Sequence, residues 1–146
     1  DPLISWSKYA GFVNPLYQEK CHSILRHGNE IAQMMKVIGE EGTSLKDYIE
    51  YLKGDFFDFV YLQQNAFDPV DEATSKERQI YLLEFICAIL DTQYSLEDKA
   101  SALNFFQALR QLMRTWNSAE YNSNEFKKIE SQITMFLETK KISQDK

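Results

Sequence analysis

The sequence predicts an all-α protein, a bundle of about five helices with one long irregular connection at about residues 63–73. Two observations indicate this class. Glycine and proline, which interrupt helices, are scarce, at 5 and 3 in 146 residues. Over most of the chain, apolar residues recur at spacings of three and four, the period of an amphipathic helix. We therefore expect residues 1–146 to form a single helical domain.

The first helix is expected to follow Asn14-Pro15, because asparagine caps helices and proline is favoured in the first turn. Its apolar residues are Leu16, Cys21, Ile24, Leu25, Ile31, Met35 and Ile38. Gly39 then stops the pattern, so a long helix is predicted between Pro15 and Gly39.

The second helix is expected to begin after Ser44, because Ser44 and Asp47 have the spacing of a capping box. Its apolar face consists of Leu45, Tyr48, Ile49, Leu52, Phe56, Phe59 and Val60, and its polar face of Lys46, Asp47, Glu50, Lys53 and Asp58. Gly54 costs this helix about 1 kcal/mol relative to alanine. We expect packing to compensate for that cost.

The third helix, around Leu82–Leu90, is apolar on nearly every side and is expected to lie at the centre of the bundle. Its predicted capping box starts at Thr74 and ends at Glu77. The fourth helix is predicted from about Leu96 to Trp116, after a capping box that starts at Ser95. Its buried stripe would be Ala100, Leu103, Phe106, Leu109, Met113 and Trp116.

The fifth helix is predicted after Asn122, which would cap it together with Glu125. Its buried residues would be Phe126, Ile129, Ile133, Phe136 and Leu137. Residues 141–146 are expected to fray. Because the chain does not open with Met, we interpret it as a fragment of a larger subunit.

Composition narrows the classes of function. A net charge of −6 argues against nucleic acid, which requires a concentrated basic face, and favours a protein partner. No run approaches the roughly 18 apolar residues of a membrane span, so we expect no direct membrane insertion. Cys21 and Cys87 stand singly in apolar helical patterns, which predicts two buried thiols in a reducing compartment, the cytoplasm.

No catalytic or metal site is predicted within the chain. Glu19 and His22 have the spacing of one Glu-x-x-His pair, but carboxylate-bridged metal sites require a second pair and the sequence has none. No serine or cysteine occupies a strand-turn-helix elbow, so a nucleophilic triad is not expected either.

The connection at residues 63–73 is longer than is usual between helices of a bundle. It is rich in side-chain amides and carries Phe67 outside the helical register. Two interpretations are open. Phe67 could fill the core while Asp68 or Asp71 forms turn hydrogen bonds, or the segment could stack on and hydrogen-bond a planar polar ring.

The segment that surrounds Phe67 resembles a known family. Tyr61-Leu-Gln-Gln-Asn-Ala-Phe-Asp-Pro-Val-Asp71 is similar to a motif in the C-terminal domain of catalytic A subunits of vacuolar/archaeal-type rotary ATPases. Ser5-Trp-Ser-Lys-Tyr9 and Met35-Lys-Val-Ile-Gly-Glu-Glu-Gly42 resemble two further landmarks of the same subunits. The resemblance covers residues 3 to 90 and indicates a rotary ATPase or ATP synthase.

The resemblance implies that the chain closes the adenine end of a nucleotide site that binds ATP or ADP. Phe67 would lie against the adenine, while Gln64, Asn65 and Ala66 would shape the base pocket. None of the five glycines begins a Gly-x-x-x-x-Gly-Lys-Ser/Thr motif, so the phosphates and Mg would be held by a nucleotide domain outside this chain. The segment alone should therefore be inactive as an ATPase.

The resemblance also implies partners. The acidic turn between the first two helices would face the central rotor stalk, with Glu40, Glu41, Ser44 and Asp47 as candidate contacts. The alternative is a solvated acidic turn. B subunits of a hexameric head would be the other partners, and the protein would be cytoplasmic, peripheral to the membrane through the assembled complex.

Two other identities are alternatives. A free-standing helical adaptor would bind a protein or peptide groove and never meet nucleotide. The related non-catalytic B subunit is disfavoured, because the Gln-Gln-Asn-Ala-Phe-Asp-Pro segment resembles the A type.

Overall fold

The computed structural model describes the backbone of residues 15–65 and 72–142, and the side chains of residues 19–60 and 77–142. Within these ranges the chain forms α2 (Pro15–Ile38), α3 (Leu45–Asn65), α4 (Glu72–Asp91), α5 (Lys99–Ser118) and α6 (Asn124–Glu138). The predicted all-α class is confirmed. No helix in the described part of the chain is long and apolar enough to cross a membrane.

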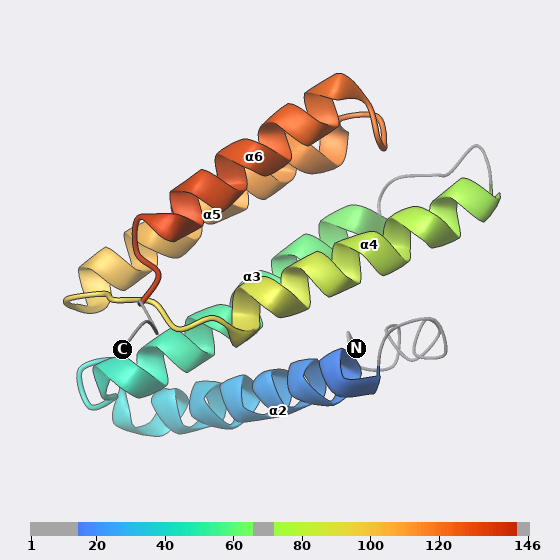
Figure 1. The fold of residues 1–146 in the computed structure, drawn as a ribbon. Helices are drawn as coiled ribbons and strands as arrows, with labels where there is room; N and C mark the ends of the chain where they lie inside the picture. Colours follow the sequence, from blue (N-terminus) through green and yellow to red (C-terminus); the bar gives the residue numbers. More distant parts are fainter. Residues whose placement is uncertain (1–14, 66–71, 143–146) are drawn as a thin grey trace.

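The helices lie roughly side by side in three tiers, with α2 below the α3–α4 pair and the α5–α6 pair above it (Figure 1). Helix α3 packs against α2 and α5, α2 also packs against α4, and α6 packs on α5. One apolar core runs through them, and its largest fully buried side chains include Trp116, Phe56, Phe57, Phe106 and Phe126. Helix α4 buries six apolar residues, in agreement with its predicted central position: Leu82, Leu83, Ile86, Cys87, Ile89 and Leu90.

Helices α2 and α3 approach each other backbone to backbone at two glycines. A Cβ atom added to Gly28 would lie 3.1 Å from the carbonyl oxygen of Glu50 and 3.4 Å from the Cα atom of Gly54. A Cβ atom added to Gly54 would lie 3.6 Å from the Cα atom of Gly28. The close approach therefore favours glycine at Gly28, whereas at Gly54 an added Cβ atom would find ordinary van der Waals contact.

The prediction of two separate thiols is wrong. Cys21 on α2 and Cys87 on α4 form a disulfide, with their Cα atoms 5.9 Å apart and both side chains buried. The two cysteines are 66 positions apart in the sequence, and a helical pattern does not indicate which helices become neighbours. Because the two cysteines are paired, they do not indicate a reducing compartment.

Lys53 was predicted to lie on the polar face of α3 and is instead buried, at 2% exposure. Its ammonium group donates a hydrogen bond of 3.2 Å to the carbonyl oxygen of Thr92, just beyond the end of α4, and lies 3.5 Å from the carboxylate of Glu50. A cation is favourable at the carboxyl end of a helix, where carbonyl groups lack partners. Lys53 thus joins α3 to the end of α4.

Helix α5 begins three residues later than its predicted capping box implies. Its N-cap is Asp98, whose carboxylate accepts a hydrogen bond of 2.8 Å from the backbone N–H of Ser101. Ser95 instead uses its backbone N–H in a 2.7 Å bond to the carbonyl oxygen of Lys140, which keeps the linker extended. The buried stripe also differs from the predicted one: it contains Ala102, Phe105, Phe106, Leu109, Met113 and Trp116, whereas Ala100 and Leu103 are exposed.

Two other helix starts differ from the prediction. Helix α6 is capped by Ser123, which accepts from the N–H of Phe126 at 3.1 Å, because Asn122 adopts a left-handed turn conformation with φ of 66°. Helix α4 begins at Glu72, so Thr74 lies in its first turn. The predicted cap of α3 is confirmed, since the N–H of Asp47 donates to the hydroxyl oxygen of Ser44 at 3.1 Å.

After α6 the chain returns to the linker between α4 and α5. An isolated β-bridge pairs Tyr94 with Lys141, and the N–H of Ile142 donates to the carbonyl oxygen of Gln93 at 3.0 Å. Residues 143–146 lie outside the described residues. The last described residues are thus bound to the α4–α5 linker.

Candidate functional site

The turn between α2 and α3 has a defined backbone. Gly39 ends α2 with φ of 82°, a left-handed conformation that favours glycine, and its N–H donates to the carbonyl oxygen of Met35 at 2.9 Å. Thr43 is buried, and its N–H and hydroxyl donate to the carbonyl oxygens of Glu40 and Gly39, each at 3.0 Å. A Cβ atom on Gly42 would lie 2.9 Å from the carbonyl oxygen of Ile38. These contacts fix the direction in which the turn presents its side chains.

The structure brings the four candidate rotor-contact residues together at this turn. Glu40, Glu41 and Ser44 are exposed and Asp47 is half-buried. Ser44 is occupied as the cap of α3, with Asp47 in the first turn of that helix. Glu40 and Glu41 are therefore the members best placed to meet another molecule.

The turn is attached to its surroundings through Glu40. The ammonium group of Lys99, at the start of α5, donates to the carbonyl oxygen of Glu40 at 2.5 Å. Burial, and after it the neighbouring carboxylate of Glu40, raises the pKa of the Tyr48 hydroxyl, which keeps the phenol neutral and able to donate. Glu40 thus joins the turn to the start of α5.

The residues predicted to shape the adenine pocket fall at the opposite end of α3. Gln64 and Asn65 are the last two residues of that helix, while Ala66 and Phe67 lie outside the described residues. Helix α3 has 21 residues, so its two ends are about 30 Å apart. The two predicted sites are therefore separated by the length of one continuous helix.

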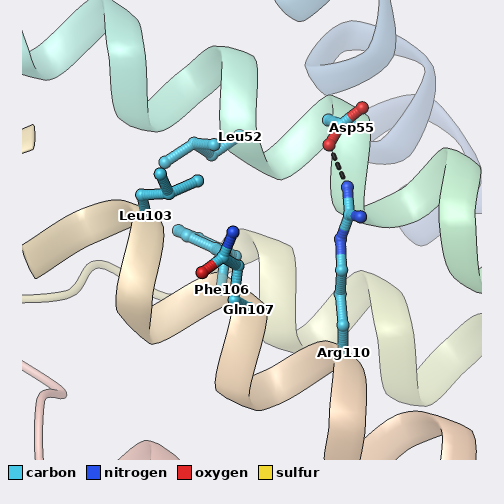
Figure 2. A pocket seen from close by; sticks show the side chains of 6 residues that line it. All are labelled: Leu52, Asp55, Leu103, Phe106, Gln107 and Arg110. Carbon is cyan, nitrogen blue, oxygen red and sulfur yellow. Dashed lines mark hydrogen bonds and ion pairs between the residues drawn. The ribbon is translucent and has the colours of Figure 1, made fainter. Parts of the chain in front are cut away.

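A hollow of about 170 Å³ between α3 and α5 was not predicted from the sequence. It is lined by Leu52 and Asp55 of α3 and by Leu103, Phe106, Gln107 and Arg110 of α5. Figure 2 shows Arg110 reaching across from α5 to form an ion pair with Asp55. Because Asp55 and Arg110 are distant in sequence, no local spacing could have indicated that they meet.

The chemistry of this hollow is that of a packing contact. Its carboxylate is neutralised by the Arg110 guanidinium, and its remaining lining is an amide and apolar carbon. The guanidinium groups of Arg110 and Arg114 also lie 4.7 Å and 5.4 Å from the ring centre of Phe59, within cation–π distance. These contacts hold α3 against α5.

Comparison with known proteins agrees with the resemblance seen in the motifs. The sequence model of the family described as "C-terminal domain of V and A type ATP synthase" matches residues 14–105, which include α2, α3 and α4 and the start of α5. No solved structure matches the chain.

Curated relatives match nearly the whole chain, including the part beyond residue 90 where no motif was recognised. A V-type ATP synthase alpha chain of Treponema denticola is 46% identical over 145 residues, which are 99% of this chain and 24% of that protein. Alpha chains of Borrelia garinii and Borreliella burgdorferi are each 43% identical over 141 residues, 97% of this chain and 24% of theirs. The chain thus spans about a quarter of the length of the curated relatives it matches.

Proposed function

The chain belongs to the family of C-terminal domains of V and A type ATP synthases, and on that premise we propose that it is the helical C-terminal part of the ATP-binding catalytic A (alpha) subunit of a rotary ATPase. The observation that carries this proposal is the family match over residues 14–105. The match disfavours a free-standing adaptor, and the relatives named alpha chains disfavour the non-catalytic B subunit. In the complete subunit the chain would couple ATP hydrolysis or synthesis to rotor movement and ion transport.

One end of the domain would close the nucleotide site. In this proposal Phe67 stacks on the adenine of ATP or ADP, and Gln64, Asn65 and Ala66 complete the base pocket. The proposal is supported by the family match, which includes residues 64–67. The phosphates and Mg belong to the nucleotide domain, because the sequence has no phosphate-binding loop, and the isolated chain should show no ATPase activity.

The other end would face the central rotor stalk through Glu40, Glu41, Ser44 and Asp47, while B subunits would flank the domain in the hexameric head. Helix α3 joins the two ends. At its middle, α3 is held by the glycine contact with α2, by buried Lys53 and by the Asp55–Arg110 ion pair with α5, and its buried apolar side chains extend from Tyr48 to Val60. A helix held on several sides moves as a rigid element, so a displacement near the adenine would reach the turn about 30 Å away.

The experiment that tests the adenine role is Phe67→Ala in the full-length subunit within its complex. Stacking on a base is worth about 1 to 3 kcal/mol, so the affinity for ATP should fall about fivefold to 150-fold. The affinity for inorganic tripolyphosphate, which has phosphates and no base, should be unchanged, and circular dichroism should show an intact helix content. Equal ATP affinity of the variant and the parent would remove Phe67 from the site.

A further inference from the structure

An arginine joins the first turns of α4 to the carboxyl end of α5. Arg78, in the second turn of α4, donates hydrogen bonds to the backbone carbonyl oxygens of Asn117 and, at 3.4 Å, of Ala119. Both carbonyls belong to the end of α5, where helix carbonyls lack intrahelical partners and carry partial negative charge. Asn117 and Ala119 are 1% and 5% exposed, so water competes little for these bonds. Arg78 thus binds α4 to the last turn of α5.

Tyr81, one turn further along α4, makes a second contact with the hairpin of α5 and α6. Its hydroxyl donates to a carboxylate oxygen of Glu130 on α6. Burial, and after it this hydrogen bond, raises the pKa of Tyr81, which keeps the phenol protonated and able to donate. The centre of its ring lies 6.1 Å from that of Trp116 and 6.0 Å from that of Phe126, within the range of aromatic pairs. We call Arg78 and Tyr81 the α4 clasp.

The α4 clasp lies close in the chain to the residue proposed to meet the adenine. Arg78 is about 9 Å along the helix axis from Glu72, where α4 begins. Phe67 precedes Glu72 by five residues, so even a fully extended chain keeps it within about 18 Å of that helix start. On the other side, α3 ends at Asn65, two residues before Phe67. The position of Phe67 therefore depends on where these two helix ends are held.

We propose that Arg78 and Tyr81 are positioning residues for nucleotide binding, which hold the start of α4 so that Phe67 can stack on the adenine. This role rests on the function proposed above. It also gives a task to the hairpin of α5 and α6, most of which lies beyond residue 105, where the family match ends. Figure 1 shows the start of α4 and the turn between α5 and α6 at the same end of the bundle. A binding group keeps its geometry only when the elements that support it are fixed.

The test measures the nucleotide affinity of Arg78→Met in the full-length subunit within its complex. The affinity for ATP should fall about twofold to 30-fold, the range for residues that act through a supporting element. The affinity for inorganic tripolyphosphate, which has no base, should stay at the parent value. The matched control is Arg110→Met, which removes an arginine that joins α5 to α3 and should leave both affinities unchanged. An unchanged ATP affinity in Arg78→Met, an equal loss for tripolyphosphate, or an equal loss in the control would overturn the proposal.

A double-mutant cycle with Phe67→Ala separates positioning from a general loosening of the fold. If Arg78 acts through Phe67, adding Arg78→Met to Phe67→Ala should lower the ATP affinity by less than about twofold further, because the supported contact is already gone. A full additional loss in that background overturns the route through Phe67. If Phe67→Ala alone lowers the ATP affinity and Arg78→Met does not, only the positioning role fails. If Phe67→Ala has no effect, the proposed adenine site fails.

Tyr81→Phe provides a milder variant, because it keeps the ring and removes one hydrogen bond. It should lower the ATP affinity about twofold and leave the tripolyphosphate affinity unchanged. This variant carries the test if Arg78→Met does not assemble, which circular dichroism and recovery of the complex would show. An ATP affinity of Tyr81→Phe equal to that of the parent overturns the role of Tyr81.

Discussion

Alanine at Gly28 and alanine at Gly54 should change the stability of the fold in opposite directions. Both glycines lie inside helices, where alanine is favoured over glycine by about 0.8–1.0 kcal/mol. At Gly54 the added Cβ atom would meet its nearest neighbours at 3.6 Å and 4.0 Å, which is ordinary van der Waals contact. Gly54→Ala should therefore raise the free energy of unfolding by about 1 kcal/mol.

At Gly28 the added Cβ atom would meet backbone atoms of α3, at 3.1 Å from the oxygen of Glu50 and 3.4 Å from the Cα atom of Gly54. Backbone inside a helix cannot rotate away, so α2 and α3 must separate by a few tenths of an ångström. Overpacking of this kind costs about 1–3 kcal/mol. After the gain in helix propensity, Gly28→Ala should lower the free energy of unfolding by up to about 2 kcal/mol.

The assay is urea unfolding monitored by circular dichroism. The slope of the unfolding free energy against urea concentration should be equal among the variants. The double variant is the internal control. Because the two Cβ atoms would occupy the same contact, the double variant should lose more unfolding free energy than the sum of the single effects, by about 0.5 kcal/mol or more. A Gly28→Ala variant more stable than the parent, or a Gly54→Ala variant less stable by 1 kcal/mol or so, would refute the packing argument.

Three further predictions concern the fold. Reducing the Cys21–Cys87 disulfide, which closes a long loop, should lower the free energy of unfolding by about 2–4 kcal/mol, and a Cys21→Ser/Cys87→Ser variant should not respond to dithiothreitol in urea unfolding. Burial raises the pKa of Tyr94 to about 12, so the stability that this side chain contributes is complete below about pH 10 and is lost as the pH rises towards 12. The melting temperature of Tyr94→Phe should therefore fall less steeply with pH than that of the parent over this range. Parallel curves for the two proteins would contradict the assignment. Asp98→Ala should lower the melting temperature, because it removes the cap of α5, whereas Ser95→Ala should leave it nearly unchanged in the same melts.

The helices were largely predictable because apolar spacing and capping residues are local features of the sequence. The first helix was predicted between Pro15 and Gly39 and is found at Pro15–Ile38. The cap of α3 at Ser44 was also correct. The cap of α5 was not, because Ser95 and Asp98 are both good caps, and the backbone N–H of Ser95 is engaged by the carbonyl oxygen of the distant Lys140.

Contacts between helices were not predictable. The pairing of Cys21 with Cys87 and the burial of Lys53 depend on which helices become neighbours, and periodicity within one helix does not contain that information. The same limit applies to the hollow between α3 and α5. A pattern of spacing identifies an apolar face but not the partner that covers it.

The candidate site was predictable in part. Glu40 and Glu41 were assigned to an exposed turn, and the structure exposes them. Ile38 was assigned to the buried face and is instead 48% exposed, because its spacing continues the apolar period while burial depends on where the neighbouring helices lie. The role of Phe67 stays a prediction, since that residue lies outside the described residues.

The pairing of the chain end with the α4–α5 linker determines how the domain bears mechanical load. Gln93 and Ser95 bond to Ile142 and Lys140, so the helical hairpin of α5 and α6 is closed at the end where it would otherwise open. A pull on the chain at Ile142 acts first on these backbone hydrogen bonds, and through them on the linker, before it can unwind α6. The hairpin would thus resist tension as one closed loop, with the linker at Gln93 as its anchor point.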